Sequence, residues 1–404
     1  MSAHAFDTPT FQWHGLQYCP FMPVFGPPQV MFERGSGTEL WDTEGKRYLD
    51  FLCGLAVTSL GHSHPVVAEA ISRQANQLLH VSNLFANPAA LKAALQVNQL
   101  LHEVTGHEGQ VFFCNSGAEA NEAALKLARK FGGRGRHGVV SAYGSFHGRT
   151  LATLAATGQP AKHEPFHPMP DGFRHAVFND IASLEGAIDP TVSAVLLEPV
   201  QGEGGVLPAD VQYLRDVRAL CDERGLVLIM DEVQTGYGRT GEWFGFQHAG
   251  VIPDVVTMAK AMGNGFPVGA CWAKREIAAV FKPGDHGSTY SGTAIATAVV
   301  SAVIDELRRI DAPRLARERG AELSARLAAV PGVASVRGTG LLLAVELAPG
   351  IDAKAVYGAL LQHGIVTNAV TATALRLAPP LTVTTDQIDE AVAALTAVLQ
   401  EIPQ

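Results

Sequence analysis

Excess positive charge is what this sequence most clearly lacks. It carries 30 lysines and arginines against 39 aspartates and glutamates, which gives a formal net charge of −9. Proteins that bind nucleic acids need a basic surface to meet the phosphates. The charge balance therefore argues against a nucleic-acid partner, while it leaves room for a local basic pocket that binds a small anion.

Long apolar runs and paired cysteines are also missing. No run approaches the roughly 18 residues that a membrane-spanning helix needs. The first Lys or Arg is Arg34, so the start of the chain lacks the charged region of a signal peptide. The five cysteines, which include no CxxC pair, are Cys19, Cys53, Cys114, Cys221 and Cys271. An odd number of thiols cannot all pair internally, so we expect reduced thiols and a cytoplasmic protein. From the missing apolar runs we expect no membrane partner, and we expect no metal site.

The chain has instead a large apolar fraction arranged for an α/β fold. Hydrophobic residues make up 47% of its 404 positions, enough for a large core and more than one domain. From about 107 to 275, short apolar segments alternate with helical patterns, which predicts a mostly parallel sheet. The candidate strands are Val111–Cys114, Gly138–Ala142, Ala194–Glu198, Leu226–Met230, Val255–Met258 and Val268–Ala273.

The rest of the pattern predicts how the domains divide. Helical periodicity covers 65–79 and 88–104, each with a proline near its start. The predicted units are an N-terminal segment at 1–60 that packs with the small domain, a large α/β domain at 61–293, a connecting helix at 294–311, and a C-terminal α+β domain at 312–404.

Two of the candidate strands stop beside residues suited to catalysis. The run Leu226–Met230 stops at Asp231, and Val255–Met258 stops close to Lys260. Ligands of parallel sheets bind at the carboxyl ends of the strands. A lysine that forms a Schiff base and a carboxylate that keeps a pyridinium nitrogen protonated are the pair that pyridoxal phosphate chemistry needs. Either residue alone is more often a solvated strand cap, so the pair needs support from other motifs.

A strand, a Ser-Gly turn and a helix follow one another in 111–130, and we expect the helix to open at Ala118. The backbone N–H groups of Ser116, Gly117 and Ala118 could bind a phosphate at the helix N-terminus. The same pattern is also a common N-cap without a ligand.

Three further segments carry candidate ligand-binding groups. In SFHGRT, Phe146 could stack on a planar ring and Arg149 could grip a carboxylate, although a core phenylalanine beside a surface arginine explains them equally well. Glu198 and Glu203 lie on a glycine-rich loop after a strand, where acids are most often only solvated. Arg376 sits between two leucines in a strand-like run, so it needs an anionic partner if it is buried.

Together these motifs resemble the class III, or ornithine-type, aminotransferases of the fold-type I pyridoxal phosphate enzymes, from about 23 to 399. The matching pieces are SGAEANEAALKLAR, SFHGRT, EPVQGEGG, DEVQTGYGRTG, MAKAMGNGFPVGA, HGSTYSG and LRLAPPL. Within the class, HVSNLF and RYLDFLCGLAV look most like members that act on acetylornithine.

The resemblance implies roles for single residues. Lys260 would bind the cofactor and act as general base, and Asp231 would pair with the pyridinium nitrogen. The cofactor would be held by Ser116, Gly117, Ala118, Phe146, Asp231, Glu232, Val233, Gln234 and Lys260, with Thr289 from the neighbouring subunit of a homodimer. The substrate would meet Arg149 and Ser288 at its distal carboxylate, Arg376 at the α-carboxylate of 2-oxoglutarate, and Glu203 as a switching glutamate that covers Arg376.

The resemblance also implies a reaction. We expect transfer of the δ-amino group of N2-acetyl-L-ornithine to 2-oxoglutarate, giving N-acetyl-L-glutamate 5-semialdehyde and L-glutamate in arginine biosynthesis. Alternatives are another ω-amine donor (ornithine, succinylornithine or 4-aminobutyrate), an aminomutase, or a non-enzymatic binding protein. The sequence departs from the family pattern at Phe25, Asn264, Ser291, Thr293 and Ala294. Of these, Phe25 leaves the amino donor open.

Overall fold

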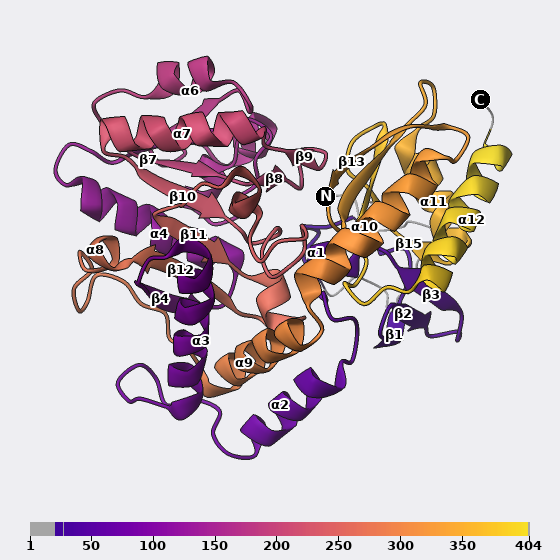
Figure 1. The fold of residues 1–404 in the computed structure, drawn as a ribbon, viewed down its shortest axis with the longest axis horizontal. Coiled ribbons are helices and arrows are strands. Elements are labelled where there is room, and N and C mark those ends of the chain that lie inside the picture. Colours follow the sequence, from indigo (N-terminus) through magenta and orange to yellow (C-terminus); the bar gives the residue numbers. More distant parts are fainter. Residues whose placement is uncertain (1–20, 27, 403–404) are drawn as a thin grey trace, which may run out of the picture.

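The structure, a computed structural model, describes residues 21–26 and 28–402, and Cys19 lies outside them. Figure 1 shows a large sheet with its helices on the left, and the C-terminal elements with the first three strands on the right. Helix α9 (Ala294–Arg309), where the sequence predicts a connection, leads from one side to the other. The domain boundaries given above stay a prediction.

Seven strands form the large sheet, in the order β4-β12-β11-β10-β7-β5-β6. Neighbours from β11 to β6 are parallel, whereas β12 runs antiparallel to both β11 and β4. The strands are β4 (Gly109–Cys114), β5 (Gly138–Ala142), β6 (Phe173–Ala176), β7 (Val192–Leu197), β10 (Val227–Asp231), β11 (Val255–Met258) and β12 (Gly269–Lys274). The mostly parallel α/β fold is thereby confirmed, and all six predicted strands are present with small shifts at their ends.

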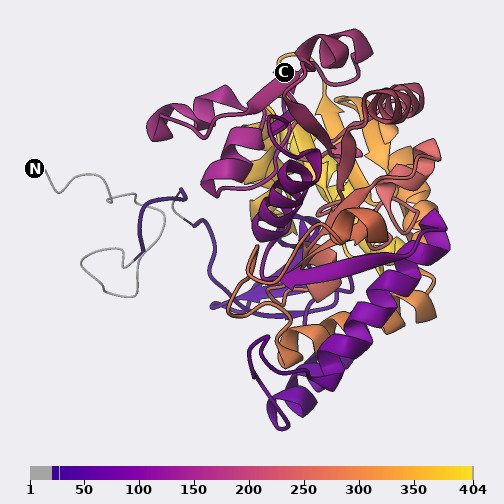
Figure 2. The same cartoon turned by 90° about the vertical axis from the view of Figure 1, so that its left-hand side faces the viewer.

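Helices cover this sheet and position its loops. α4 packs on β7, β11 and β12, while α2 and α3 pack against α9 below the sheet (Figures 1 and 2). The helices before the C-terminal part are α1 (Cys53–Ala56), α2 (Pro65–Ala75), α3 (Pro88–Thr105), α4 (Gly117–Gly132), α5 (Leu151–Ala156), α6 (Ile181–Ala187), α7 (Val211–Arg224), α8 (Arg275–Ala278) and α9. Short 3-10 turns are η1 (Pro160–Lys162), η2 (Glu164–Phe166), η3 (Gly245–Ala249) and η4 (Lys260–Gly263), and a small ribbon pairs β8 (Val200–Gln201) with β9 (Leu207–Pro208).

Helices and two small sheets make up the other side of the molecule. The antiparallel sheet has the order β13-β14-β17-β16, and a second sheet has the order β1-β2-β3-β15. Its indigo strands lie beside the yellow C-terminal elements in Figure 1 because β3 and β15 pair in parallel. The elements are β1 (Phe32–Ser36), β2 (Glu39–Asp42), β3 (Arg47–Asp50), α10 (Ala312–Ala328), β13 (Val333–Thr339), β14 (Leu342–Leu347), α11 (Ala353–Gln362), β15 (Ile365–Val366), β16 (Asn368–Ala369), β17 (Ala374–Leu377) and α12 (Thr385–Glu401).

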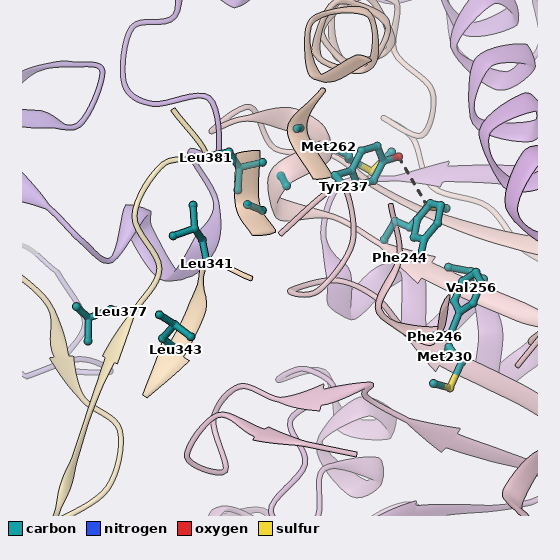
Figure 3. Packing of buried hydrophobic residues seen from close by; sticks show 14 of the residues in the cluster. Met230, Tyr237, Phe244, Phe246, Val256, Met262, Leu341, Leu343, Leu377 and Leu381 are labelled. Carbon is teal, nitrogen blue, oxygen red and sulfur yellow. Dashed lines mark hydrogen bonds between the residues drawn. The ribbon is translucent and has the colours of Figure 1, made fainter. Parts of the chain in front are cut away.

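One apolar core runs through both sides. Figure 3 shows Met230 and Val256 of the large sheet in the same cluster as Leu343 and Leu377 of the C-terminal sheet. Backbone contact at the junction is close, since a Cβ at Gly340 would lie 2.6 Å from the Arg239 carbonyl oxygen. A tightly packed interior is hardly compressible, so it holds the two sheets in a fixed relative position, and their side chains can meet at a fixed geometry.

Two further findings concern the whole described chain. None of its helices is both long and apolar enough to cross a membrane. Each of the four described cysteines is buried and free.

Candidate active site

Asp231 ends β10, and its carboxylate is held from three directions. Oδ2 accepts hydrogen bonds from Asn121 Nδ2 at 2.7 Å and from His147 Nδ1 at 2.8 Å. Oδ1 accepts one from the Val233 N–H at 3.1 Å. Only 4% of Asp231 is exposed. The carboxylate is therefore fixed in one orientation by groups from α4, from the loop after β5, and from its own turn.

Lys260 opens the 3-10 turn η4, directly after the neighbouring strand β11. Its φ of +48° lies in the left-handed region, which costs a non-glycine residue about 1–2 kcal/mol. Burial lowers the pKa of the Lys260 amine and the Arg376 cation adds to this, whereas Glu203 and Asp231 act in the opposite direction. An amine with a lowered pKa is more often free to act as a nucleophile or base.

A cavity of about 250 Å³ brings these two residues together. It is lined by Gly117, Ala118, Asn121, Phe146, His147, Gly148, Arg149, Glu198, Glu203, Asp231, Val233, Gln234 and Lys260. Most residues predicted for the site are in this lining. Ser116, Glu232, Ser288, Thr289 and Arg376 are not.

The N-terminus of α4 forms one end of the cavity. The helix begins at Gly117, one residue before the predicted Ala118, and Ser116 is its N-cap, accepting from Glu119 N–H at 3.2 Å. A Cβ at Gly117 would lie 2.8 Å from a methyl group of Val233, so only glycine fits there. The first N–H groups of a helix have no acceptor within the helix and favour an anion.

Phe146, Glu198 and Gln234 form the walls. The Phe146 N–H donates to Glu198 Oε2 at 3.0 Å, and burial together with the nearby Asp231 charge raises the pKa of Glu198 well above its usual range. Gln234 Oε1 is buried without a hydrogen-bond partner among the described residues, and a Cβ at Gly202 would collide with it. The wall thus contains a buried polar atom without a partner in the described part of the chain, and such atoms in proteins usually have one.

Arg376 lies in β17, behind the cavity, and reaches it through Glu203. Its Nη1 donates to Glu203 Oε1 at 2.5 Å and to the Gly202 carbonyl at 3.3 Å, while Nε donates to Asn368 Oδ1 at 3.2 Å. Arg376 is fully buried, and its Nη2 has no partner in the described part of the chain. Burial opposes ionisation of Glu203, but the Arg376 charge and hydrogen bond outweigh it and lower the pKa.

Three predicted residues point elsewhere in this chain. The Glu232 carboxylate accepts from Thr235, Gly245 and Phe246 on the side away from the cavity. Ser288 accepts from Asn115 Nδ2 at 3.1 Å, and Thr289 is exposed.

Sequence reasoning gave no role to Asn121 and His147, the two side chains that hold Asp231. His147 was visible inside SFHGRT, yet nothing in the spacing tied it to a residue 84 positions away.

Two of the departures from the family pattern, Asn264 and Ser291, have local structural explanations. Asn264 adopts the left-handed conformation that ends η4, and its side chain bridges the Leu60 N–H and the Gly61 carbonyl at 2.7 and 3.1 Å. Ser291 Oγ accepts from Asn83 at 2.8 Å. Phe25 is 89% exposed, so it does not line the cavity of this chain.

Comparison with known proteins supports the resemblance that the sequence motifs indicate. The family described as "Aminotransferase class-III" matches residues 23–399. The chain belongs to the class III aminotransferases. As a member of this class it is an enzyme that depends on pyridoxal phosphate.

Individual relatives match over nearly their whole length. The chain is 47% identical to the acetylornithine aminotransferase of Corynebacterium efficiens, over 94% of both chains. It is 46% identical to that of Gloeobacter violaceus, over 95% of this chain and 96% of the relative.

Solved structures of aminotransferases also superpose on nearly the whole chain. The N-acetylornithine aminotransferase of Stenotrophomonas maltophilia superposes with a TM-score of 0.80 at 33% identity, over 93% of this chain and 96% of the other. The ornithine aminotransferase of Toxoplasma gondii superposes with 0.87 at 32% identity, over 94% and 92%.

The residues present fit pyridoxal phosphate. The N-terminus of α4 at Gly117 and Ala118 lines the cavity and favours a phosphate, and the buried oxygen of Gln234, a lining residue, lacks a partner among the described residues. Asp231 offers a fixed carboxylate to a ring nitrogen, and Lys260 offers an amine to an aldehyde. These are the four kinds of group that this cofactor requires.

Proposed function

We propose that this enzyme transfers the δ-amino group of N2-acetyl-L-ornithine to 2-oxoglutarate, forming N-acetyl-L-glutamate 5-semialdehyde and L-glutamate for arginine biosynthesis. The observation that carries the choice of an ω-amine donor with 2-oxoglutarate is the ion pair between Glu203 and Arg376, and the similarity to acetylornithine aminotransferases supports acetylornithine as that donor. The reacting carbon of an ω-amine carries no carboxylate, so a buried cation beside that carbon needs an internal acid. 2-Oxoglutarate brings its own carboxylate to the same place, where it can replace Glu203.

The cofactor-binding roles are assigned from the cavity. The N–H groups of Gly117 and Ala118 would bind the phosphate, Phe146 and Val233 would flank the ring, Gln234 would meet its phenolic oxygen, and Asp231 its nitrogen. Bound there, the cofactor supplies an electron sink for the carbon that loses a proton. Asn121 and His147 keep Asp231 in place.

The chain's own residues would then handle the substrate and its proton. Lys260 Nζ takes the proton from the reacting carbon and returns it, because its lowered pKa makes the free amine available. Arg149, exposed at the cavity, would bind the distal carboxylate of both substrates. Arg376 would bind the α-carboxylate of 2-oxoglutarate after Glu203 turns away.

We further propose that the enzyme works as a homodimer in which Thr289 and Ser288 serve the neighbouring site. Large apolar side chains are exposed on the surface of the single chain, on this loop and within residues 79–95. They are Leu79, Leu84, Phe85, Leu91, Leu95 and Tyr290, each more than half exposed. Tyr290 contacts His80 with ring centroids 5.5 Å apart, so the loop and 80–85 form one surface that suits a second copy.

A cytoplasmic location is part of the proposal. It rests on the four buried free thiols, which suit a reducing compartment.

A panel of donors tests the proposed reaction. Acetylornithine, succinylornithine, ornithine and 4-aminobutyrate are compared by kcat/KM at saturating 2-oxoglutarate. Acetylornithine should give the highest value. A higher value for any other donor would replace acetylornithine as the substrate while leaving the aminotransferase chemistry in place.

A further inference from the structure

Two cations lie over a single aromatic ring beside the cavity. Arg149 Cζ is 5.5 Å from the centroid of the Phe146 ring, and Lys162 Nζ is 5.5 Å from the same centroid. Phe146 and Arg149 line the cavity, whereas Lys162 comes from η1 and stands outside the lining. Since each charge is 5.5 Å from the same centroid, the two positive charges lie no further apart than twice that distance, close enough for Arg149 to act on Lys162.

Neither of these charges is neutralised within the described chain. Arg149 makes no hydrogen bond or ion pair with any residue of 21–26 and 28–402, and Lys162 donates only to the neutral amide oxygen of Gln159. Arg376, at the other end of the site, is covered by Glu203. Arg376 behind the cavity is therefore compensated, whereas Arg149 in the lining and Lys162 beside it are not, and the field of these two cations attracts anions and repels ammonium groups.

Electrostatic coupling agrees with this arrangement. Burial lowers the pKa of Lys162, the nearby Arg149 lowers it further, and Glu203 acts in the opposite direction. Lys162 also contributes to the lowered pKa of Glu203. Lys162 thus lies within electrostatic range of both residues that we assign to substrate exchange.

The two cations differ in what they can recognise. Arginine offers a planar fork for two hydrogen bonds to a carboxylate, whereas a lysine acts chiefly as a point charge. Acetylornithine presents a carboxylate and a neutral amide at its distal end, with a net charge of −1 there by simple chemistry. Ornithine presents a carboxylate and an ammonium, which cancel. The arginine guanidinium can bind the carboxylate of either donor. Discrimination between acetylornithine and ornithine therefore needs a second positive charge that responds to the net charge of the distal end.

We propose that Lys162 is a specificity-determining residue that favours donors with a net negative distal end, and so selects N-acylated over free α-amino donors. The inference rests on the proposed function of the site and adds to it the charge selectivity of the donor. Attraction to the carboxylate and repulsion of the ammonium act together, as in other sites that discriminate by an unfavourable contact with the wrong ligand.

The experiment compares Lys162→Met, which keeps most of the side-chain length, with Lys162→Arg, which keeps the charge. We measure kcat/KM for acetylornithine, for ornithine, and for 5-aminopentanoate, which carries a distal carboxylate without an α-substituent. In Lys162→Met the preference for acetylornithine and for 5-aminopentanoate over ornithine should fall on the order of fivefold, the range expected for a partly exposed charge. Lys162→Arg should keep both preferences.

Salt gives a readout that a purely structural role would not move. Raising the ionic strength from 0.05 to about 0.5 M should lower the wild-type preference towards that of Lys162→Met, and should change the preference of the variant little. Equal losses for all three donors, or an unchanged preference in Lys162→Met, would overturn the inference. If the wild type does not use acetylornithine, the proposed function fails, and the pair 5-aminopentanoate and ornithine still tests Lys162.

Discussion

Arg376 and Glu203 meet 2.5 Å apart where the C-terminal sheet touches the loop after β8, and Arg376 keeps Nη2 without a partner in the described chain. The loop itself is tied at both ends. Arg376 donates to the Gly202 carbonyl at 3.3 Å, and Arg337 Nε donates to the Gly205 carbonyl at 2.8 Å. Glu203 can therefore leave Arg376 most easily by turning its side chain, without moving the backbone.

Glu203→Ala should affect the two half-reactions unequally. With the ω-amine donor, Arg376 would be left buried and unpaired, and breaking a buried pair costs about 3–5 kcal/mol; partial exposure of Glu203 reduces this. We expect at least a tenfold slower half-reaction with acetylornithine, while that with glutamate is spared or improved. Arg376→Ala should chiefly impair glutamate and 2-oxoglutarate. Single-turnover absorbance measurements separate the two steps, and equal losses in both for Glu203→Ala would rule out the switch.

Asn264→Gly and Asn264→Ala should both destabilise the enzyme, by different amounts. Either change removes the bonds to the Leu60 N–H and the Gly61 carbonyl, and leaving such buried groups without a partner costs about 1–3 kcal/mol. Alanine at a φ of +43° also costs about 1 kcal/mol or more, whereas glycine adopts the same φ without this strain. Urea unfolding of the holoenzyme measures both variants. A glycine variant as stable as the wild type would show that the side-chain bridge contributes nothing.

The order of structural elements could be predicted because the buried strands are short apolar runs that stop at turn residues. β6 escaped prediction because it is a four-residue edge strand, FRHA, in which only Ala176 is fully buried. Asp231 and Lys260 were recognisable as residues that follow such runs. Their shared cavity follows from the parallel pairing of β10 and β11.

Residues that act through tertiary contacts could not be found in the same way. Asn121 and His147 reach Asp231 from other elements, and no spacing in the sequence reveals those contacts. The position of Glu232, in contrast, follows from the alternation of side chains along a strand. Successive residues at a strand end point to opposite sides, so an Asp231 that faces the cavity predicts a Glu232 that does not.

Glu232 should make stability depend on pH. Burial raises its pKa to about 7 against the donors Thr235, Gly245 and Phe246, whereas an unfolded glutamate has a pKa near 4.3. The native state then holds the extra proton, so this contribution is present below about pH 4.5 and is lost as pH rises through about 7. Glu232→Gln removes the titratable carboxyl group. The stability of the wild type relative to this variant should therefore fall by on the order of 3 kcal/mol between pH 4.5 and 8. Urea unfolding across this range measures it, and a constant difference would contradict a raised pKa.

The proposed sharing of sites between subunits predicts complementation between two damaged enzymes. Lys260→Ala lacks the amine of its own site, and Thr289→Val lacks the hydroxyl that we assign to the partner's cofactor, so each homodimer should be inactive when the cofactor is limiting. A hybrid dimer has one site with both defects and one with neither. Random exchange makes half of the dimers hybrid, so activity should return to about a quarter of the wild-type value. Distinct affinity tags on the two variants measure subunit exchange independently of activity. A mixture of Lys260→Ala with wild type shows how much activity a hybrid dimer with one intact site has. If Thr289 served the cofactor of its own chain, each hybrid would carry one defect in each site, and exchanged mixtures would stay inactive.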